Sequence, residues 1–391
     1  MDELTLDKGR RRALKLLGVS SAAALAGACQ TEPAAPPAEE APSFFKDTAG
    51  FVEHGTLSLE PRIEDLGGYI TPNDQFFVRN NSYSIALNAA DYRLEVAGDA
   101  AASPLTLTYD ELLAMPSRTV YAYIECGGNQ RSFFASAMGQ PAQGTQWQRG
   151  GVGMAIWEGV PLRDVLQRAG VSEKASFVQM IGMDKDSPEG GFRRPMTLEK
   201  ALDEDTILAY RMNGAPLPKD HGFPVRAIVP GWVGSNQVKW LGRIEALMEP
   251  AWTRNVTTSY VLIGDAYPKE GEASGKIITE QSIKSMLILP WPATLKPGRQ
   301  RLRGYAYSPN GPVERVEWKA DGGAWQSAQL IDPPMKYAWR RFEFEWDAAA
   351  GAHTLSTRAT DAAGVTQPDV LPFNEKGYLY NVPLEHPVTV A

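Results

Sequence analysis

The residue with the clearest chemical potential is a single cysteine, Cys126, which stands in the run Tyr-Ala-Tyr-Ile-Glu-Cys-Gly-Gly-Asn-Gln-Arg-Ser over 121–132. A strand-like stretch leads to this thiol, and the two glycines after it predict a turn at which a large ligand can approach the backbone. Arg131 adds a cation, and a nearby cation favours the thiolate, the form that binds metals. The residues favour a reactive or metal-bound thiol; a buried structural cysteine is the alternative.

Two further clusters of basic residues lie far from this cysteine in the sequence. One contains Arg79, in the run Phe-Phe-Val-Arg-Asn-Asn over 76–81, and the other covers 221–243. The basic side chains of interest in the second cluster are His221, Arg226 and Lys239. Cations set among Gly, Pro and Trp indicate a bound anion such as a phosphate, while a salt-bridged structural network is the alternative.

The segments around these residues are expected to mix strands and short helices. Alternating or short apolar runs predict strands over 91–98, 177–181 and 225–229. A helix is expected over 108–115, where Thr108 and Glu111 have the spacing of a capping box. A second helix is expected over 161–170, with Pro first and Gly last. The mixed order and the long irregular connections predict an α+β fold.

The sequence pattern changes at about residue 276, where short strand-like runs recur between turn signals. The expected strands cover 282–289, 301–307, 313–319, 325–330, 340–346 and 353–360. Strands at this spacing predict an immunoglobulin-like sandwich. No pair of cysteines bridges its sheets, so burial alone must hold this core.

The first 29 residues have the organisation of a bacterial export signal. Three arginines at 10–12 precede an apolar stretch, and small residues lead to Cys29. The Arg-Arg-x-x-Leu-Lys pattern resembles a twin-arginine signal, and the run before Cys29 is similar to a lipoprotein cleavage site, with Ala26 where Leu is usual. The Pro-, Ala- and Glu-rich run over 30–45 predicts an extended tether. An amphipathic helix start is the alternative for the leader.

Composition excludes several other classes of protein. A length of 391 residues predicts about two domains. Two cysteines exclude a disulfide scaffold and a multi-cysteine metal site, and the absence of Cys-x-x-Cys-His excludes covalent haem. No run of about 20 apolar residues predicts a helical membrane span. The net charge is −7, and the leader carries +2, which leaves −9 for the rest and argues against nucleic acid as a partner.

Four runs in order resemble the sulfite oxidase family of molybdenum enzymes. They are 76–80, 125–132, 208–226 and 238–243, and the resemblance extends over about 60–391. It implies a molybdopterin-binding domain of the sulfite oxidase fold over 46–275 and an immunoglobulin-like dimerisation domain over 276–391. The signal over 1–29 and the tether over 30–45 precede them. The haem b5 domain of the family is not expected here.

The resemblance also assigns site residues. Cys126 matches the thiolate ligand of molybdenum, Tyr260 an active-site tyrosine, and Arg79 and Arg131 the groups that act on the substrate. The other matches to the substrate pocket are Trp147 and Arg340, the latter contributed by the second domain. The matches to contacts with molybdopterin and its phosphate are Phe77, Val78, Arg79, Asn80, Asn81, Asp184, His221, Arg226, Gln237, Val238 and Lys239. Asn81 departs from the histidine that is usual in the family.

The function implied by the resemblance is oxidation of sulfite to sulfate by oxygen transfer, with electrons passed to an external c-type cytochrome. A homodimer through the sandwich is expected, with Trp325 and Trp339 as exposed aromatic residues at the interface. The leader implies export, with a lipid anchor at Cys29. Two alternatives remain: a molybdopterin reductase of an S-oxide or another oxyanion, and a non-enzymatic surface lipoprotein scaffold.

Overall fold

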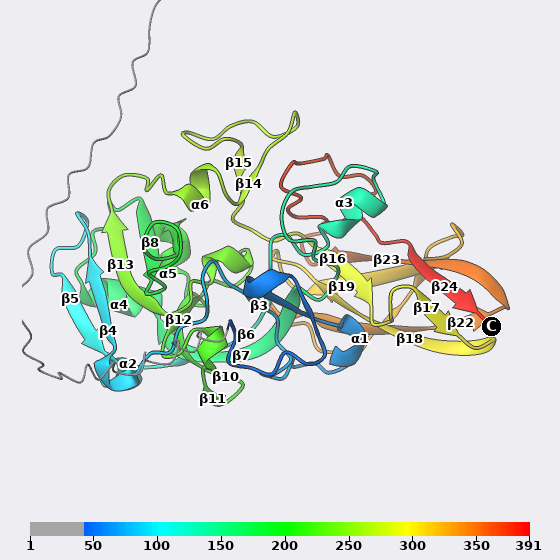
Figure 1. Ribbon diagram of the computed structural model, residues 1–391, viewed down its shortest axis with the longest axis horizontal. Helices are drawn as coiled ribbons and strands as arrows, with labels where there is room; N and C mark the ends of the chain where they lie inside the picture. The colour runs from blue at the N-terminus through cyan, green and yellow to red at the C-terminus, as the bar shows by residue number, and fades with distance from the viewer. Residues whose placement is uncertain (1–42) are drawn as a thin grey trace, which may run out of the picture. The chain divides into compact units, whose positions relative to one another are not determined.

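The computed structural model describes residues 43–391, so the export signal over 1–29 and the tether as far as residue 42 lie outside the described residues. Strands and short helices alternate in the first part of the described chain, and strands dominate the part after residue 276 (Figure 1). None of the helices in the described part is long and apolar enough to cross a membrane.

The α+β part is built on two five-stranded sheets. In the first, the strand order is β11-β10-β7-β6, and β12 also pairs with β10. Its strands are β6 (Arg118–Glu125), β7 (Val152–Pro161), β10 (Ile207–Met212), β11 (Ala215–Pro216) and β12 (Arg226–Ile228). In the second, the order is β5-β4-β13-β8-β9. Its strands are β4 (Arg93–Ala97), β5 (Leu105–Thr108), β8 (Phe177–Gly182), β9 (Arg193–Thr197) and β13 (Leu241–Leu247).

Smaller elements connect and flank these sheets. A three-stranded sheet and a two-stranded one contain β1 (Phe51–Glu53), β2 (Ser58–Pro61), β3 (Val78–Arg79), β14 (Val261–Leu262) and β15 (Lys276–Ile277). The α-helices are α1 (Ile63–Leu66), α2 (Tyr109–Leu113), α3 (Ser132–Ser136), α4 (Leu162–Arg168), α5 (Leu198–Leu202) and α6 (Arg254–Thr257). The 3₁₀ turns are η1 (Gly55–Leu57), η2 (Ala89–Asp91), η3 (Lys219–His221) and η4 (Gly234–Asn236).

The local sequence signals describe the helix ends well. Thr108 caps α2, and its side chain accepts from the Glu111 N–H while the Glu111 carboxylate accepts from the Thr108 N–H, which confirms the capping box. Pro161 directly precedes α4, and Gly170 adopts a φ of 62° just beyond its end. The mixed α+β class is therefore confirmed, since β13 runs parallel to β4 and antiparallel to β8.

The C-terminal part is a sandwich of two sheets. The orders are β16-β18-β22-β21 and β17-β24-β23-β19-β20. The first sheet contains β16 (Lys284–Leu287), β18 (Gly298–Tyr307), β22 (Arg340–Ala348) and β21 (Gln329–Leu330). The second contains β17 (Ala293–Leu295), β24 (His386–Val390), β23 (Gly351–Asp361), β19 (Val313–Ala320) and β20 (Gln326–Ser327). The strand expected over 325–330 divides, because β20 pairs with β19 while β21 pairs with β22 in the other sheet.

The two parts share a buried apolar boundary. Tyr123 and Met154 of the α+β part join Tyr305, Tyr307 and Trp339 of the sandwich in one buried cluster. The prediction that Trp339 is an exposed interface residue is wrong, because its ring is fully buried and stacks on Tyr305 with centroids 3.9 Å apart.

Trp325 is the other aromatic residue expected at an interface. It is half-buried, and the ammonium of Lys319 and the guanidinium of Arg358 lie 4.5 and 4.3 Å from its ring centroid. These cations cover part of the ring within the same chain.

Candidate active site

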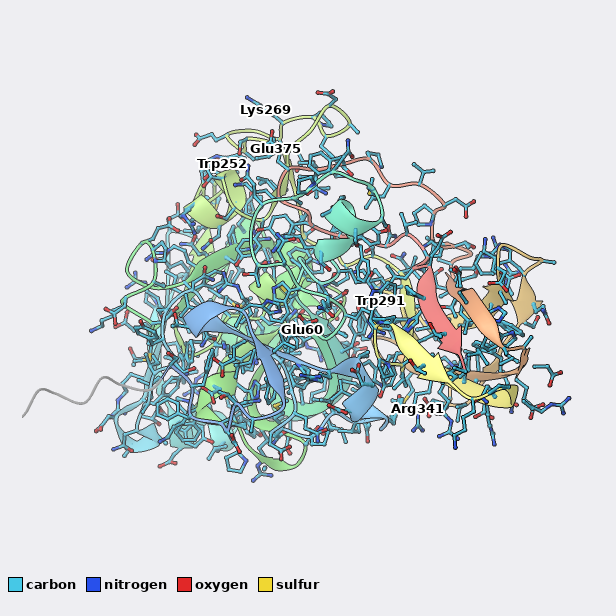
Figure 2. All side chains as sticks on the ribbon, turned by 45° about the vertical axis from the view of Figure 1, so that its right-hand side comes forward. Glu60, Trp252, Lys269, Trp291, Arg341 and Glu375 are labelled. Carbon is cyan, nitrogen blue, oxygen red and sulfur yellow. The ribbon has the colours of Figure 1, made fainter. Side chains whose placement is uncertain are left out.

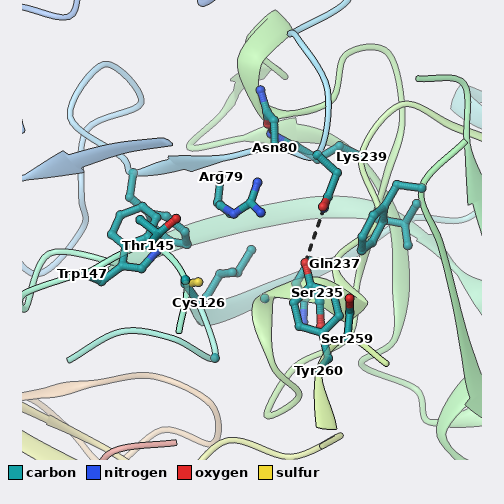
Figure 3. A pocket seen from close by; sticks show the side chains of 18 of the residues that line it. Arg79, Asn80, Cys126, Thr145, Trp147, Ser235, Gln237, Lys239, Ser259 and Tyr260 are labelled. Carbon is teal, nitrogen blue, oxygen red and sulfur yellow. Dashed lines mark hydrogen bonds between the residues drawn. The ribbon is translucent and has the colours of Figure 1, made fainter. Parts of the chain in front are cut away.

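A cavity of about 410 Å³ gathers residues from distant parts of the chain. The end of β6, the segment around β3, the run over 219–240 and the loop before β14 all line it, together with a segment near residue 377. Figure 3 shows Cys126 and Arg79 among the lining side chains, with Trp147 and Tyr260 on opposite sides in this view. The three regions singled out from the sequence therefore meet in one place.

Cys126 lies immediately after β6, where the chain leaves the sheet. Its thiol is free and partly accessible, its N–H donates to the Gly151 carbonyl at 2.8 Å, and its own carbonyl accepts from the Asn129 N–H at 2.8 Å. The loop is thus held at both sides of the sulfur by backbone hydrogen bonds. A thiol fixed in this way at a cavity wall is suited to bind a metal.

The two glycines after Cys126 differ, because Gly127 lines the cavity as expected, whereas protein side chains occupy the space beside Gly128. A Cβ on Gly128 would lie 2.4 Å from a guanidinium nitrogen of Arg131, and a Cβ on Gly127 would lie 3.3 Å from the Ile278 side chain. Gly144 and Gly377 pack against Arg131 in the same manner. The glycines are therefore needed because protein side chains occupy that space.

Arg131 lines the cavity but is also bound to the protein. Its Nε donates to the Lys376 carbonyl and its Nη1 to the Thr145 carbonyl, both at 2.7 Å. The Tyr378 ring lies 4.9 Å from the guanidinium carbon. No carboxylate in the described part of the chain pairs with Arg131, so its positive charge is free to act on an anion.

The second basic cluster forms another wall. Arg226 donates to the carbonyls of His221 and Gln237, both at 3.0 Å, and burial lowers its pKa to about 9. The Lys239 ammonium donates to the Asn80 side chain and to the Asp220 carbonyl. Burial, reinforced by the charge of Arg226, lowers the pKa of Lys239 well below its usual value. These cations repel one another and gain from an added anion.

The remaining polar residues of this wall are tied to the backbone. The Gln237 amide bonds both the N–H and the carbonyl of Val229, at 2.6 and 2.7 Å, which fixes the loop between β12 and η4. The Asp184 carboxylate accepts from the Phe192 N–H at 3.0 Å, and burial raises its pKa. Their side chains therefore shape the wall through hydrogen bonds within the protein.

An aromatic wall faces these groups. The Tyr260 ring lies 5.7 Å from that of Tyr378 and 5.3 Å from the guanidinium of the buried Arg194. Tyr260 has a φ of 55°, an uncommon backbone conformation for a non-glycine residue. The Asn81 amide donates to the Tyr260 hydroxyl at 3.4 Å. The hydroxyl hydrogen of Tyr260 is therefore available to a group in the cavity.

The structure brings all but two of the sixteen assigned site residues to this cavity. Those that line it are Phe77, Arg79, Asn80, Asn81, Cys126, Arg131, Trp147, Asp184, His221, Arg226, Gln237, Val238, Lys239 and Tyr260. Val78 packs instead with Phe44 and Leu59 in a separate apolar cluster.

The structure does not place Arg340 in the cavity, contrary to the prediction that it belongs to the substrate pocket. Its guanidinium donates to the carbonyls of Asp332 and Val313, at 2.9 and 2.8 Å, within the sandwich, and it is absent from the cavity lining. The sandwich part reaches the cavity through a different segment, which contributes Lys376 and Tyr378. Glu375 of this segment donates its N–H to the Ile263 carbonyl, and Figure 2 shows it near the loops of Trp252 and Lys269.

Sequence reasoning missed several lining residues besides these two. They include Gln143, Thr145, Phe192, Ser235, Arg254 and Ser259. The run Asn-Glu-Lys-Gly-Tyr over 374–378 contains a cation beside a glycine, the same type of signal as the run around Arg131. Because this run lies far along the chain from the other clusters, the sequence gave no reason to assign it to the same site.

The charges of the cavity decide what it can hold. Six basic side chains line it: Arg79, Arg131, Arg226, Lys239, Arg254 and Lys376. Asp184 is the only acid in the lining within the described residues. One guanidinium nitrogen of Arg79 is buried without a hydrogen-bond partner. Such a surplus of cations, of which Arg131 and Arg226 are buried, fits an anionic ligand.

The cavity lining contains one thiol and, within the described residues, no cluster of protein ligands that would hold a metal by itself. No group of three or more His, Cys, Asp or Glu side chains suited to a metal occurs among residues 43–391. A metal carried by an anionic organic cofactor, with Cys126 as its protein ligand, satisfies both the thiol and the cations. The residues therefore fit molybdopterin with its phosphate.

Comparison with family models gives two matches. Residues 81–254 match the oxidoreductase molybdopterin binding domain, and residues 275–390 match the Mo-co oxidoreductase dimerisation domain. Together they cover most of the α+β part and the sandwich.

Known relatives include mitochondrial sulfite oxidase of Mus musculus, 34% identical over 343 residues, which are 83% of this chain and 62% of that protein. Sulfite oxidase of Gallus gallus is 34% identical over 80% of this chain and 71% of its own length. The chain thus spans less than two thirds of the mouse protein. Among solved structures, the sulfane dehydrogenase SoxCD of Paracoccus pantotrophus superposes with a TM-score of 0.75, at 29% identity over 85% of this chain and 86% of that one.

Proposed function

The chain belongs to the sulfite oxidase family of molybdopterin oxidoreductases, and we propose that it oxidises sulfite to sulfate with an external c-type cytochrome as electron acceptor. The observation that supports this most directly is one cavity that joins the Cys126 thiol to six basic side chains. Oxidation of sulfite with water yields sulfate, two protons and two electrons. The site must therefore bind a small anion, move protons and release electrons singly.

Molybdopterin is the cofactor of this family domain, and the residues divide its binding between two walls. Cys126 is the thiolate ligand of the molybdenum. Arg226 and Lys239 hold the phosphate, because they are enclosed cations without carboxylate partners at their guanidinium and ammonium groups, and His221 adds a neutral ring. When bound, the cofactor supplies oxygen transfer and takes up two electrons.

The protein groups around the sulfur bind and orient the substrate. Arg79 and Arg131 attract the sulfite dianion, and Lys376 adds a cation from the sandwich part. The buried and unpartnered nitrogen of Arg79 gains a hydrogen bond when an anion enters. The Tyr260 hydroxyl accepts from Asn81 and can therefore donate its hydrogen to a substrate oxygen.

The two electrons released by each oxidation need an acceptor. A c-type cytochrome with a basic rim suits the net charge of −9 on residues 30–391, because opposite charge speeds encounter. We propose that the chain is exported by the twin-arginine route and anchored through Cys29. Fractionation that finds the wild-type protein only in the cytoplasm would contradict export, and a fully soluble periplasmic protein would contradict the anchor.

The dimerisation domain supports a homodimer. Light scattering at micromolar concentration is expected to give twice the mass of the mature chain. A monomer across that range would contradict the assembly without affecting the assignment of the cavity.

A second candidate substrate is a sulfane sulfur, because the superposed SoxCD structure is that of a sulfane dehydrogenase. The deciding experiment measures molybdenum and pterin content, then turnover of sulfite and of a sulfane compound with cytochrome c. We expect one molybdenum and one pterin per chain and a higher kcat/KM for sulfite. Loaded protein that oxidises the sulfane compound and not sulfite would replace the first candidate with the second.

A further inference from the structure

A short N-terminal segment, residues 43–48, packs over the basic wall of the cavity. The backbone N–H of Phe45 and that of Lys46 donate to the Asp220 carboxylate at 3.0 and 2.8 Å. Phe44 is buried beside Leu59 and Val78. This segment, hereafter the latch, includes residues 43–45 of the expected tether, which are packed against the protein instead of extended away from it.

The Lys46 side chain connects the latch to His221 in the cavity wall. Its ammonium lies 2.7 Å from the Phe76 carbonyl, 3.1 Å from the Asn73 carbonyl and 3.0 Å from Nε2 of His221. An ammonium has three hydrogens and no lone pair. A fourth acceptor, the Asp74 carbonyl, is the most distant, at 3.4 Å. The three nearer acceptors therefore take the three hydrogens, and Nε2 of His221 presents its lone pair to Lys46.

The state of the His221 ring follows from this contact. The Asn73 carbonyl lies 3.2 Å from Nε2, but the Lys46 ammonium is closer, at 3.0 Å, and has no lone pair to accept a hydrogen. Neutral His221 therefore carries its hydrogen on Nδ1. His221 lines the cavity, and no hydrogen bond from Nδ1 to the described residues is present. The Nδ1–H group is therefore free to donate to an anion.

We propose that Lys46 is a positioning residue that fixes His221 as the Nδ1–H tautomer, and that the latch thereby retains the phosphate of the cofactor. The retention half rests on the proposed function, since it takes the anion at His221 to be that phosphate. The tautomer half rests on the contacts alone.

The electrostatics of the two groups agree with this assignment. Burial lowers the pKa of His221 well below its usual value, and the charges of Lys46, Lys239 and Arg226 add to that effect. The ring is thus neutral at physiological pH and can have only one hydrogen-bearing nitrogen. Burial also lowers the pKa of Lys46, to about 8, while the charge of Asp220 opposes that shift. Lys46 is thus still mainly protonated at pH 7.

The main competing explanation is that Lys46 only anchors the N-terminal segment. Lys219 offers a matched control, because its ammonium lies 4.6 Å from the Phe45 ring and so also contacts the latch, but it makes no bond to His221. Lys219 is exposed. The variants to compare are therefore Lys46→Met and Lys219→Met.

The first experiment reads the tautomer directly in apo-protein. The chain has only four histidines, so ¹⁵N-histidine labelling gives a simple long-range nitrogen–proton spectrum, and His221→Gln assigns the signal. We expect an Nδ1–H pattern in the wild type and in Lys219→Met. In Lys46→Met we expect a change toward Nε2–H, which can then donate to the Asn73 carbonyl. An Nε2–H pattern in the wild type, or an unchanged pattern in Lys46→Met, would overturn the proposal.

The second experiment measures cofactor retention. Loaded protein is dialysed, and the remaining pterin is oxidised and measured by fluorescence. We expect loss from Lys46→Met roughly tenfold faster than from the wild type or Lys219→Met, the effect of one hydrogen bond to a charged group. Equal rates would overturn the role in retention. Wild-type protein without any pterin would instead refute the proposed function, and the tautomer spectrum would still decide the role of Lys46.

Discussion

Charged side chains have different partners in the cavity and on the outer face of the sandwich. On β18, Arg299, Arg301 and Arg303 face Glu343, Glu345 and Asp347 of β22, and these cross-strand neighbours form ion pairs. Most of these side chains remain exposed. In the cavity, Arg226 and Lys239 are enclosed, and only carbonyl and amide oxygens accept their hydrogens.

The difference shows which region depends on a ligand. Exposed pairs in water gain little and cost little, so the face of the sandwich is complete by itself. Enclosed cations that bond to no carboxylate carry a desolvation cost that a bound anion offsets. The α+β part should therefore be less stable without cofactor, whereas the sandwich should not respond to it.

A third arrangement stands at the boundary between the two parts. Lys284 of β16 donates to Glu125, the residue before Cys126, at 2.6 Å, and both side chains are buried. Tyr307 and Asn129 donate to the same carboxylate oxygen, each at 2.9 Å. This pair is buried like the cations of the cavity, but its charges neutralise each other as they do in the pairs of the sandwich. It therefore connects the loop of Cys126 to the second domain without a bound anion.

The largest effect is expected at the thiol. Cys126→Ser should lower sulfite turnover by about three orders of magnitude or more, because an alcohol does not replace a thiolate as metal ligand. The fold should persist, since the backbone hydrogen bonds around this residue do not use the side chain. Steady-state kinetics and circular dichroism check the two statements. Full activity in this variant would remove Cys126 as a ligand.

The next largest effect is expected on kcat/KM, and it compares a variant of Arg79 in the cavity with a variant of Arg340 in the sandwich. Arg79→Gln should lower kcat/KM for sulfite roughly 10- to 200-fold, the loss of one hydrogen bond between charged groups. Arg340→Gln should change it less than about twofold, because its guanidinium is bound to carbonyls of the sandwich. Equal losses in both variants would show that the sandwich contributes Arg340 to the site after all.

A stability measurement tests the cost of the enclosed cations. Lys239→Met should stabilise the apo-protein at pH 7 by about 1–3 kcal/mol in urea unfolding while abolishing cofactor binding. Burial lowers the pKa of Lys239 in the folded state, so the unfolded state binds more protons up to about pH 10.5. The wild type should therefore gain stability as the pH rises toward that value, and the gap should close. A destabilised apo-variant would mean that Lys239 is compensated within the protein.

The smallest effect is expected on the sandwich. Glu343→Gln removes the carboxylate that pairs with Arg301 and Arg303. The melting temperature should change by less than about 2 °C, with or without cofactor, because both arginine partners are exposed to water and ion pairs with exposed partners contribute little. A larger shift, or one that depends on cofactor, would break the contrast between the two regions.

Sequence reasoning succeeded where the signal is local. The capping box at Thr108, the termination of α4 near Gly170 and the strands of the sandwich depend on neighbouring residues and on alternation. It failed where the partner is distant. The run over 325–330 reads as one strand, but two sheets each take part of it, because strand pairing is decided by the neighbours.

The candidate site shows the same division. The basic and thiol-containing runs were recognisable because their composition is unusual for a core. The space around Gly128 was misjudged, since only the folded loop shows that Arg131 fills it. Arg340 was misplaced because a tryptophan–arginine pair on a strand does not reveal which face it occupies or what lies opposite.

The sequence by itself determined the fold class, the thiol, the basic clusters and the family, because these depend on residue types in short runs. Only the tertiary structure decided that Lys376 joins Arg131 across 245 residues and that Lys46 joins His221 across 175. Such contacts leave no trace in either local sequence, since each side chain is chosen by surroundings that exist only after both segments have packed together. The chemistry of the cavity therefore follows from the short sequence runs, whereas the contacts of Lys376 and of the latch arise only on folding.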